Sequence, residues 1–411
     1  MINVWVNAVN KLDEYGPIVG PAILDDLRLI AGKLKGKKVQ HVNSTAVGGG
    51  VAEILNRMVP LLKELGIDTR WDFVKGGEKF FNVTKKFHNA LHGRAEEITR
   101  GDFETFMETS RQNIEEFDAS GDIVFIHDPQ PIALIKKKKN NKWIWRCHVD
   151  VSDPNARVWS FLMDFIEQYD SAVFSAPSFS RRLPIRQFLI SPSIDPLSDK
   201  NKDLPEDVIN DVLEKYGILR DKPIITQISR FDRLKDPVGV IDAYQQVKKY
   251  TDCRLILAGG GASDDPEGIE VLNEVMEKAK KDKDIHILLL PQDDIVINAL
   301  QRASTVIIQK SLREGFGLTV AEALWKGKPV VASNVGGIPL QIKHKYSGLM
   351  CRSVQGAAFA IKQLLNSPEY AKKLGENGRE HIRNNYLITR HLRDYMLLFL
   401  SLFYKDDIVY L

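Results

Sequence analysis

The sequence predicts an α/β protein with two doubly wound domains that face each other across a cleft. Two observations lead to this fold class. Short apolar runs alternate with amphipathic helical patterns along most of the chain, which is the pattern of parallel sheets joined by crossover helices. The chain has 411 residues. It is therefore longer than the roughly 300 residues at which a single hydrophobic core stops growing.

Composition and charge are those of an ordinary globular protein. Hydrophobic residues make up 44% of the chain, charged residues 27%, and the net charge is +3. A charge so close to neutral gives no reason to expect a nucleic-acid partner. The three cysteines, Cys147, Cys253 and Cys351, are far apart and form no CxxC pair. This spacing argues against a disulfide framework and a zinc site, and it fits a cytoplasmic location.

We expect no signal peptide at the start of the chain and a packed helix in its most apolar stretch. Residues 1–20 lack a basic start followed by an unbroken apolar run, so no signal peptide is expected. The most apolar stretch, Tyr395–Tyr404, would rise only ~15 Å as a helix, about half of a bilayer core. A membrane-surface helix is the alternative, but no basic face accompanies the stretch. We expect a helix within residues 389–411 that packs back across the domains, without stable membrane insertion.

A polar segment with several prolines, Pro192–Asp207, is typical of an interdomain linker. We therefore expect one domain at residues 1–195 and another at 196–388. The strands expected before the linker are Lys38–Asn43, Asp122–His127, Trp143–His148, Ser171–Ser175 and Gln187–Ile190. Those expected after it are Ile224–Ser229, Arg254–Ala258, His286–Leu290, Thr305–Gln309 and Pro329–Ala332. Helical patterns between strands include Val51–Leu65 and Phe103–Phe117. Such domains bind ligands at the carboxyl ends of their strands.

The segment Ser311–Gly327 reads as a strand end, a glycine-containing turn and a helix that begins near Leu318. Free amides at a helix N-terminus form an anion site, and glycine lets the backbone approach a ligand. Glu314 lies in the turn and Glu322 about one turn into the helix. One carboxylate could accept from the hydroxyls of a sugar and the other from those of a ribose. The alternative is a surface acid and a helix-capping acid.

The loop Ser229–Pro237 directly follows the first strand of the second half. Arg230 and Lys235 are five positions apart in it and can converge on one site. Two cations near a diphosphate stabilise the charge that grows as a sugar–phosphate bond breaks. Loop cations are usually only solvated. The two glutamates expected on a neighbouring strand end favour the functional interpretation.

Two further loops belong to the first half. Asn43–Leu55 contains three glycines that run into a helix, typical of a phosphate cradle, although a tight turn without a ligand is the alternative. It is neither a Walker loop nor a dinucleotide fingerprint. His148 ends a strand, where it could bond to a sugar hydroxyl or serve only the structure. Asp128 and Gln130 follow the preceding strand and suit the hydroxyls of an acceptor sugar.

The sequence gives no sign of a metal site. It contains no GxSxG, no HExxH, and no Asp-x-Asp at a strand end. The acidic pairs Asp264-Asp265, Asp293-Asp294 and Asp406-Asp407 read as loop or helix-start residues. We expect no bound metal ion.

Four segments together resemble the large family of retaining glycosyltransferases with the GT-B fold, in which two Rossmann-like domains face each other. They are EGFGLTVAEA, the Arg230/Lys235 loop, VGGIP (Val335–Pro339) and PSIDP (Pro192–Pro196). The resemblance spans residues 38–385. Longer strings are similar to the trehalose glycosyltransferring synthases: HVNSTAVGGGVAEIL, IHDPQP, WRCHVDVSDPN and QKSLREGFGLTVAEALWKG. The related trehalose phosphorylases share much of this pattern.

The resemblance implies a role for each matching residue. Arg230 and Lys235 would hold the diphosphate of a nucleotide-sugar, and Glu322 its ribose. His148 would lie near the 6-hydroxyl of the sugar at the reaction centre. The residues implied in catalysis are Arg230, Lys235, Glu314 and His148. Those implied in donor binding are Gly49, Gly50, Gly315, Phe316, Gly317, Leu318, Thr319 and Glu322. The N-terminal domain would hold the acceptor and the C-terminal domain the nucleotide-sugar.

The implied function is transfer of glucose from a nucleoside-diphosphate glucose to glucose, which gives trehalose with retained configuration. Three alternatives stay open: a phosphorolytic trehalose enzyme, a transferase with another acceptor as in sucrose synthesis, and a non-catalytic sugar-nucleotide sensor. No cofactor is required, and magnesium stays open as a ligand but is not implied. The expected partners are the nucleotide-sugar and a small sugar acceptor, and a homodimer is the assembly considered. The base of the nucleotide is not identified.

One stretch departs from the family pattern. Such proteins commonly carry an Asp-Gly turn after the residues that match Gln341-Ile342. Here the sequence is KHKYSG, Lys343–Gly348. The departure weakens any transfer of roles to this segment.

Overall fold

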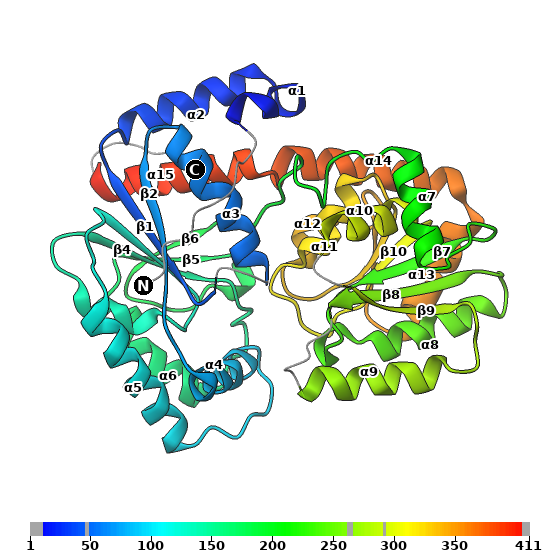
Figure 1. Cartoon of the computed structure of the whole chain (residues 1–411), viewed down its shortest axis with the longest axis horizontal. Helices are drawn as coiled ribbons and strands as arrows, with labels where there is room; N and C mark the ends of the chain where they lie inside the picture. The colour runs from blue at the N-terminus through cyan, green and yellow to red at the C-terminus, as the bar shows by residue number, and fades with distance from the viewer. Residues whose placement is uncertain (1–10, 46–48, 261–265, 291–292, 405–411) are drawn as a thin grey trace. The chain divides into compact units, whose positions relative to one another are not determined.

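The computed structural model describes residues 11–45, 49–260, 266–290 and 293–404. The chain divides into two compact units, each of which contains one parallel sheet (Figure 1). Unit 1 comprises Met1–Ser193 and Ile388–Leu411, and unit 2 comprises Ile194–Leu387.

Unit 1 contains a six-stranded sheet in the order β2-β1-β3-β4-β5-β6, and all its strands are parallel. The strands are β1 Lys38–Asn43, β2 Asp68–Phe73, β3 Ile123–His127, β4 Lys142–Cys147, β5 Ser171–Phe174 and β6 Arg186–Leu189. The α-helices are α1 Gly16–Val19, α2 Pro21–Lys33, α3 Gly49–Glu64, α4 Glu78–Leu91, α5 Arg100–Glu116, α6 Ala156–Ile166 and α15 Ile388–Phe403. Short 3₁₀ helices are η1 Leu12–Tyr15, η2 Ile132–Lys137 and η3 Pro177–Phe179.

Helices cover both faces of the unit 1 sheet (Figure 1). The helices α2, α3 and α15 pack together over one face, and α4, α5 and α6 over the other. Strand β3 is buried at all five positions, as expected for a central strand of a parallel sheet. Its Phe125 contacts Tyr395 of α15, with ring centroids 4.8 Å apart. The apolar stretch of the last helix therefore contributes to the core of unit 1. No helix in the described ranges is long and apolar enough to cross a membrane.

Unit 2 repeats this architecture with the strand order β12-β11-β10-β7-β8-β9, again all parallel. The strands are β7 Ile224–Ile228, β8 Arg254–Gly260, β9 Ile285–Leu290, β10 Val306–Gln309, β11 Val330–Ser333 and β12 Leu349–Cys351. The helices are α7 Glu206–Lys215, η4 Arg233–Lys235, α8 Pro237–Lys248, α9 Pro266–Ala279, α10 Asp294–Ala303, α11 Leu318–Trp325, α12 Ile338–Gln341, α13 Val354–Asn366 and α14 Pro368–Asn385. One core packs α8, α9 and α13 on the sheet, and a second packs α7 and α10 on its other face.

The ten expected strands match ten strands of the structure, but β2 and β12 were not expected. β2 reads DTRWDF, in which charged residues interrupt the apolar ones. Its Asp72 is nevertheless buried. Gln40 of β1 donates to the Asp72 carboxylate at 2.7 Å, and this hydrogen bond offsets the cost of burying the charge. β12 has only three residues, which is too short for a recognisable pattern.

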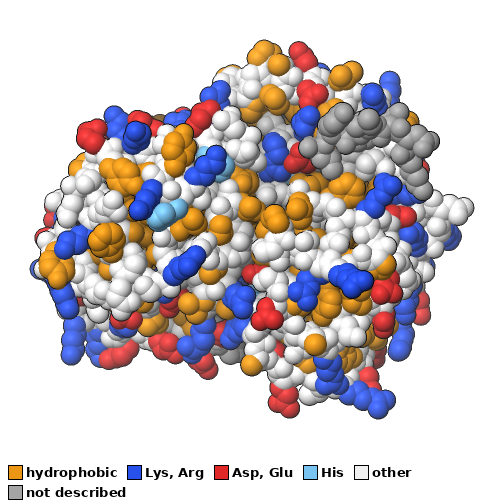
Figure 2. Space-filling view, turned by 180° about the vertical axis from the view of Figure 1, so that it is seen from behind, with side chains coloured by type: hydrophobic (Ala, Val, Ile, Leu, Met, Phe, Trp, Pro, Cys, Tyr) orange, Lys and Arg blue, Asp and Glu red, His pale blue; other side chains and the backbone are white. Residues whose placement is uncertain are grey.

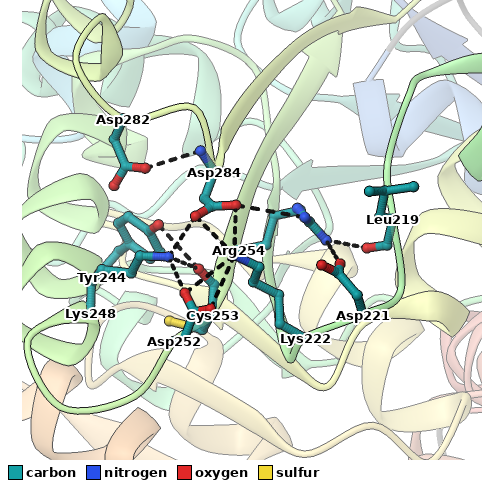
Figure 3. Close-up of polar contacts among 10 residues, drawn as sticks. All are labelled: Leu219, Asp221, Lys222, Tyr244, Lys248, Asp252, Cys253, Arg254, Asp282 and Asp284. Carbon is teal, nitrogen blue, oxygen red and sulfur yellow. Dashed lines mark hydrogen bonds and ion pairs between the residues drawn. The ribbon is translucent and has the colours of Figure 1, made fainter.

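A network of ion pairs joins the amino ends of β7, β8 and β9 (Figure 3). Asp284 precedes β9 and lies 2.7 Å from Nζ of Lys248 and 3.0 Å from that of Lys222. Arg254 opens β8 and reaches Asp221 at 2.8 Å. These contacts tie loops and strands at the amino end of the sheet, opposite the carboxyl end at which open α/β sheets bind ligands. The network therefore stabilises the fold without occupying the carboxyl end of the sheet.

Charged side chains of both signs are interspersed over the face drawn in Figure 2. Neither sign gathers into a large patch there. This distribution matches the small net charge of the chain.

Candidate active site

The strand order of unit 2 reverses between β7 and β10. β7 pairs with β8 on one side and with β10 on the other, so the loops after β7 and β10 leave the same edge in opposite directions. Open α/β sheets bind ligands at such a position. The loop after β7 carries Arg230 and Lys235, and the loop after β10 carries Glu314.

Lys235 and Glu314 meet at this position. Nζ of Lys235 lies 2.6 Å from Oε2 of Glu314, and the two side chains are 19% and 9% exposed. The hydroxyl of Ser311 donates to the same oxygen at 3.0 Å. Both bonds end on Oε2, so within the described residues Oε1 is left for a ligand. The pair combines a cation and an acceptor in one half-buried place.

The turn that carries Glu314 is held by close backbone packing. Gly317 has φ +82° and caps α11, where amides at the helix N-terminus are free for an anion. Gln341 donates to the carbonyl of Phe316 at 2.5 Å. Gly336, with φ +56°, packs against the turn. Only glycine fits there, because a Cβ at this position would lie 1.6 Å from the carbonyl oxygen of Glu314. The VGGIP segment thus fixes the turn.

Arg230 lies apart from this pair in the structure. Its side chain is 62% exposed and contacts Asp232 at 3.3 Å. Asp232 also caps the short helix η4 by accepting from the amide of Leu234 at 2.7 Å. The structure therefore brings Lys235, but not Arg230, into contact with Glu314.

Glu322 is buried on the side of α11 that faces α10. It is 2% exposed, and its Oε2 accepts from Nε2 of Gln301 at 3.3 Å. Among the other expected donor residues, Phe316 is buried against Tyr386, whereas Gly315, Leu318 and Thr319 are half-buried. The hydroxyl of Thr319 donates to Gln309 at 3.4 Å.

In unit 1 the strand order reverses between β1 and β3. Asp128 follows β3 with φ +64°, a conformation that is uncommon for residues other than glycine. Its carboxylate accepts from the amide of His148 at 2.8 Å, which joins the ends of β3 and β4. Burial raises the pKa of Asp128 to about 6. Gln130 lies nearby in sequence, and its Oε1 is buried without a partner among the described residues.

The glycine segment after β1 lies partly outside the described residues, which omit Ala46–Gly48. Gly49 has φ +80° and opens α3 together with Gly50. The side chain of Asn43 closes the end of β1, since Oδ1 accepts from the amide of Ser44 at 2.6 Å. The start of a 16-residue helix at the strand-order reversal is a suitable anion site.

Known proteins resemble the chain along most of its length. Residues 41–181 match the family described as the N-terminal domain of trehalose synthase, and residues 209–381 match glycosyl transferases group 1. A trehalose synthase of Pyrococcus horikoshii is 44% identical over 394 residues, which cover 94% of this chain and 95% of that protein. A trehalose synthase of Rubrobacter xylanophilus is 43% identical over 412 residues, with 97% and 98% covered. The chain belongs to the trehalose synthase family. It is a hexosyltransferase.

More distant likenesses extend this picture. A trehalose phosphorylase of Pleurotus pulmonarius is 29% identical, and the match covers 92% of this chain but 59% of that protein. Among solved structures, a sucrose-phosphate synthase from Thermosynechococcus elongatus has a TM-score of 0.73 at 18% identity, covering 90% and 100% of the two chains. A UDP-forming α,α-trehalose-phosphate synthase from Burkholderia xenovorans, in complex with glucose-6-phosphate, has a TM-score of 0.72 at 14% sequence identity. The match covers 89% of this chain and 100% of that chain. These likenesses show that this trehalose synthase family member has the GT-B fold.

The departure from the family pattern forms an ordered turn. Lys345 takes φ +64° in the KHKYSG stretch, and its amide donates to the carbonyl of Gly348 at 2.9 Å. Ser347 is fully buried, and its hydroxyl accepts from the amide of Lys343 at 2.9 Å. The stretch therefore keeps a tight turn with a lysine in a conformation that favours glycine.

Several residues at these sites were not singled out from the sequence. Ser311 and Gln341 bond to the turn around Glu314, and His41 bonds to His127, which was expected from the sequence to line the same cleft as Asp128. Ser311 could have been suspected, because it lies only three positions before Glu314. Gln341 and His41 come from other elements, so sequence spacing gave no signal. No group of three or more His, Cys, Asp or Glu side chains within the described ranges is placed to hold a metal ion.

Proposed function

We propose that this trehalose synthase family member transfers glucose from a nucleoside-diphosphate glucose to free glucose, reversibly and with retained configuration. The product is the α,α-1,1-linked disaccharide trehalose. The observation that carries the proposal is the contact of Lys235 with Glu314 at the strand-order reversal of unit 2, beside the N-terminus of α11. A cation and helix amides suit a diphosphate, and a carboxylate suits sugar hydroxyls.

The proposed roles follow this chemistry. Lys235 and Arg230 stabilise the negative charge of the leaving diphosphate. Arg230 is exposed and, among the described residues, is paired with Asp232, so its side chain is available to an arriving phosphate. Glu314 binds the hexose through its carboxylate, and Glu322 binds the ribose after giving up its contact with Gln301. The amides of Gly49 and Gly50 bind phosphate oxygens, and Asp128, Gln130 and His148 contact sugar hydroxyls.

Phosphorolysis of trehalose is the second candidate, supported by the similarity to the trehalose phosphorylase of Pleurotus pulmonarius. Inorganic phosphate would then bind Lys235 and Arg230 in place of the diphosphate. The synthase is preferred because the synthases match at 44% identity over nearly their whole length, whereas the phosphorylases are matched over 59% of theirs.

Product analysis tests the choice. The purified protein is incubated with glucose and a panel of nucleoside-diphosphate glucoses, and separately with trehalose and inorganic phosphate. We expect trehalose and a free nucleoside diphosphate in the first reaction. We expect no glucose-1-phosphate in the second. Formation of glucose-1-phosphate, without any nucleotide-dependent trehalose, would refute the synthase. Nucleotide-sugar binding without turnover would instead indicate a sensor.

A further inference from the structure

Three histidines from neighbouring strands form a continuous hydrogen-bonded series in unit 1, here called the histidine relay. His41 lies on β1, His127 ends β3, and His148 follows β4. Nδ1 of His41 is 3.0 Å from Nε2 of His127. Nδ1 of His127 is 3.1 Å from Nε2 of His148. His41 and His127 are fully buried, whereas His148 is half-buried at the carboxyl edge of the sheet.

The surroundings of the histidine relay keep its rings in place and uncharged. Phe125 stacks on His127 at 4.8 Å and lies 5.2 Å from His41. Burial lowers the pKa of His41 to about 3 and holds the pKa of His127 and His148 well below 6.5. Arg146 of β4 faces His127 and His148, His391 of α15 faces His127, and the carboxylate of Asp128 accepts from the amide of His148 at 2.8 Å. A positive charge on the relay would be repelled by Arg146.

Neutral rings carry one proton each, so the relay has two possible directions. Either each Nδ1–H donates toward His148, or each Nε2–H donates toward His41. The second direction would leave an N–H at Nε2 of His41, which is buried without a partner among the described residues. Buried N–H groups without an acceptor are rarer than acceptors without a donor. Arg146, whose Nε and Nη1 are buried without partners in the described part of the chain, contributes donors and no acceptor beside the relay.

We propose that His127, backed by His41, is a positioning residue that fixes His148 as a hydrogen-bond donor through Nδ1 to an oxygen of the sugar substrate. Nε2 of His148 accepts from His127, so the proton of the neutral ring sits on Nδ1. Nδ1 makes no hydrogen bond to the described residues and is left for a ligand. This inference rests on the proposed function in one respect, namely that His148 contacts sugar.

A neutral donor suits glycosyl transfer for a physical reason. Positive charge grows on the sugar ring as the bond to phosphate breaks. An imidazolium beside that ring would oppose the charge, whereas a neutral N–H can bind a hydroxyl oxygen and orient the sugar. The histidine relay therefore lets His148 orient the sugar without placing a positive charge beside the sugar ring.

The first test measures which nitrogen of His148 carries the proton. The protein is labelled with ¹⁵N-histidine, and the ring resonances of His148 are assigned by their loss in His148→Gln. We expect Nδ1 to be protonated in the parent. In His127→Phe, which keeps a ring but removes both bonds, we expect the proton on Nε2, the tautomer that unconstrained histidine favours. His127→Asn keeps an amide N–H near the position of Nδ1 and should preserve the parent tautomer.

His391→Phe is the matched control. His391 is a buried histidine of the same unit, but it bonds to Ser193 at 2.9 Å and lies outside the relay. Its replacement should leave the His148 tautomer unchanged. Protonation of Nε2 in the parent would overturn the proposal, as would Nδ1–H that persists in His127→Phe. The parent spectrum alone tests proton placement, so the proposal stays open to refutation even if His127→Phe does not fold.

The second test is kinetic. We expect His127→Phe to lower kcat about ten- to hundredfold with little change in the KM for the nucleotide-sugar, because orientation and not donor affinity is lost. His127→Asn should recover activity to within a few-fold of the parent. Unchanged kcat in His127→Phe would overturn the positioning role. The tautomer of His148 can be measured whether or not the protein is active. If the proton moves from Nδ1 to Nε2 in His127→Phe but the parent makes no trehalose, the proposed function is refuted and the positioning role of His127 is kept.

Discussion

Nζ of Lys235 lies 2.6 Å from Oε2 of Glu314, although the two residues are 79 positions apart in sequence. The contact exists because β7 and β10 are neighbours in the sheet, so the loops that follow them meet at one edge. A bound diphosphate would compete with Glu314 for the lysine. Donor binding would then release the carboxylate toward the hexose.

The first prediction concerns Lys235 and Arg230 in the loop after β7. Lys235→Ala and Arg230→Ala should each lower kcat/KM about 100- to 1000-fold, because each removes a charge that stabilises the leaving diphosphate. Arg233→Ala is the matched control. It removes a cation from the same loop that is already paired with Glu274 at 2.8 Å, so activity should stay near that of the parent. Steady-state kinetics of folded variants decide the matter. A rate within a few-fold of the parent would remove the altered residue from the mechanism.

The two glutamates should act on different parts of the donor. Glu314→Ala should impair the chemical step, and Glu322→Ala should mainly weaken nucleotide binding. A 2′-deoxyribose donor should bind poorly to the parent but almost equally to parent and variant once Glu322 is gone. A donor without the 3-hydroxyl of the sugar should lose its penalty only in the Glu314 variant. If both analogues report on the same glutamate, the assignment is wrong.

Metal independence is the third prediction. Excess chelator should leave most of the transferase activity intact, because cationic side chains and helix amides are proposed to bind the diphosphate. The measurement is trehalose formation before and after dialysis against chelator. Complete loss that a divalent ion restores would contradict this view of the site.

Low pH should reduce the stability of unit 2, because Asp284 loses its charge. The hydrogen bond from Lys248 is the largest cause that lowers the pKa of Asp284 to about 2, and Lys222 adds to it. A carboxyl with a lowered folded pKa stabilises the protein fully above its unfolded pKa of about 4, and this stabilisation is lost as pH falls toward about 2. We expect Asp284→Asn to lower the free energy of unfolding on the order of 1 kcal/mol at pH 7 and to reduce its decline below pH 4.

Asp252 supplies the control for Asp284. Its side chain is 69% exposed and shares the same two lysines. Urea unfolding of Asp252→Asn at pH 7 should show a smaller loss than Asp284→Asn. An equal loss in both variants would show that burial of Asp284 does not matter to the network.

The turn after Ile342 can be stabilised. Lys345 is exposed with φ +64°, so Lys345→Gly should relieve backbone strain and raise the free energy of unfolding by about 0.5–1 kcal/mol without loss of activity. Gly336→Ala is the opposite case, since its Cβ would collide with the carbonyl of Glu314, and it should lose both stability and activity. Urea unfolding of the two variants tests both. A destabilised Lys345→Gly would mean that the lysine side chain contributes more than the strain costs.

The sequence was sufficient where a local pattern carries the information. Strand periodicity placed the two sheets, and glycine before a helical pattern placed the start of α11 at Leu318. It was insufficient where partners come from distant elements. Arg230 and Lys235 share the loop after β7, but Glu314 comes from the loop after β10, and the structure brings Lys235 and not Arg230 into contact with it. The histidine relay depends on the register of β1, β3 and β4, which no spacing within one segment reveals.

The return of α15 to unit 1 bears on how the chain folds during synthesis. Unit 2 is continuous in sequence, whereas unit 1 needs the last helix to complete its core. Until Ile388–Phe403 leaves the ribosome, the face of Phe125 that Tyr395 covers stays open to solvent. Domains generally fold as units, and usually the N-terminal one first. Here the nested second unit can finish before the first, so nascent unit 1 is the form that needs protection from aggregation.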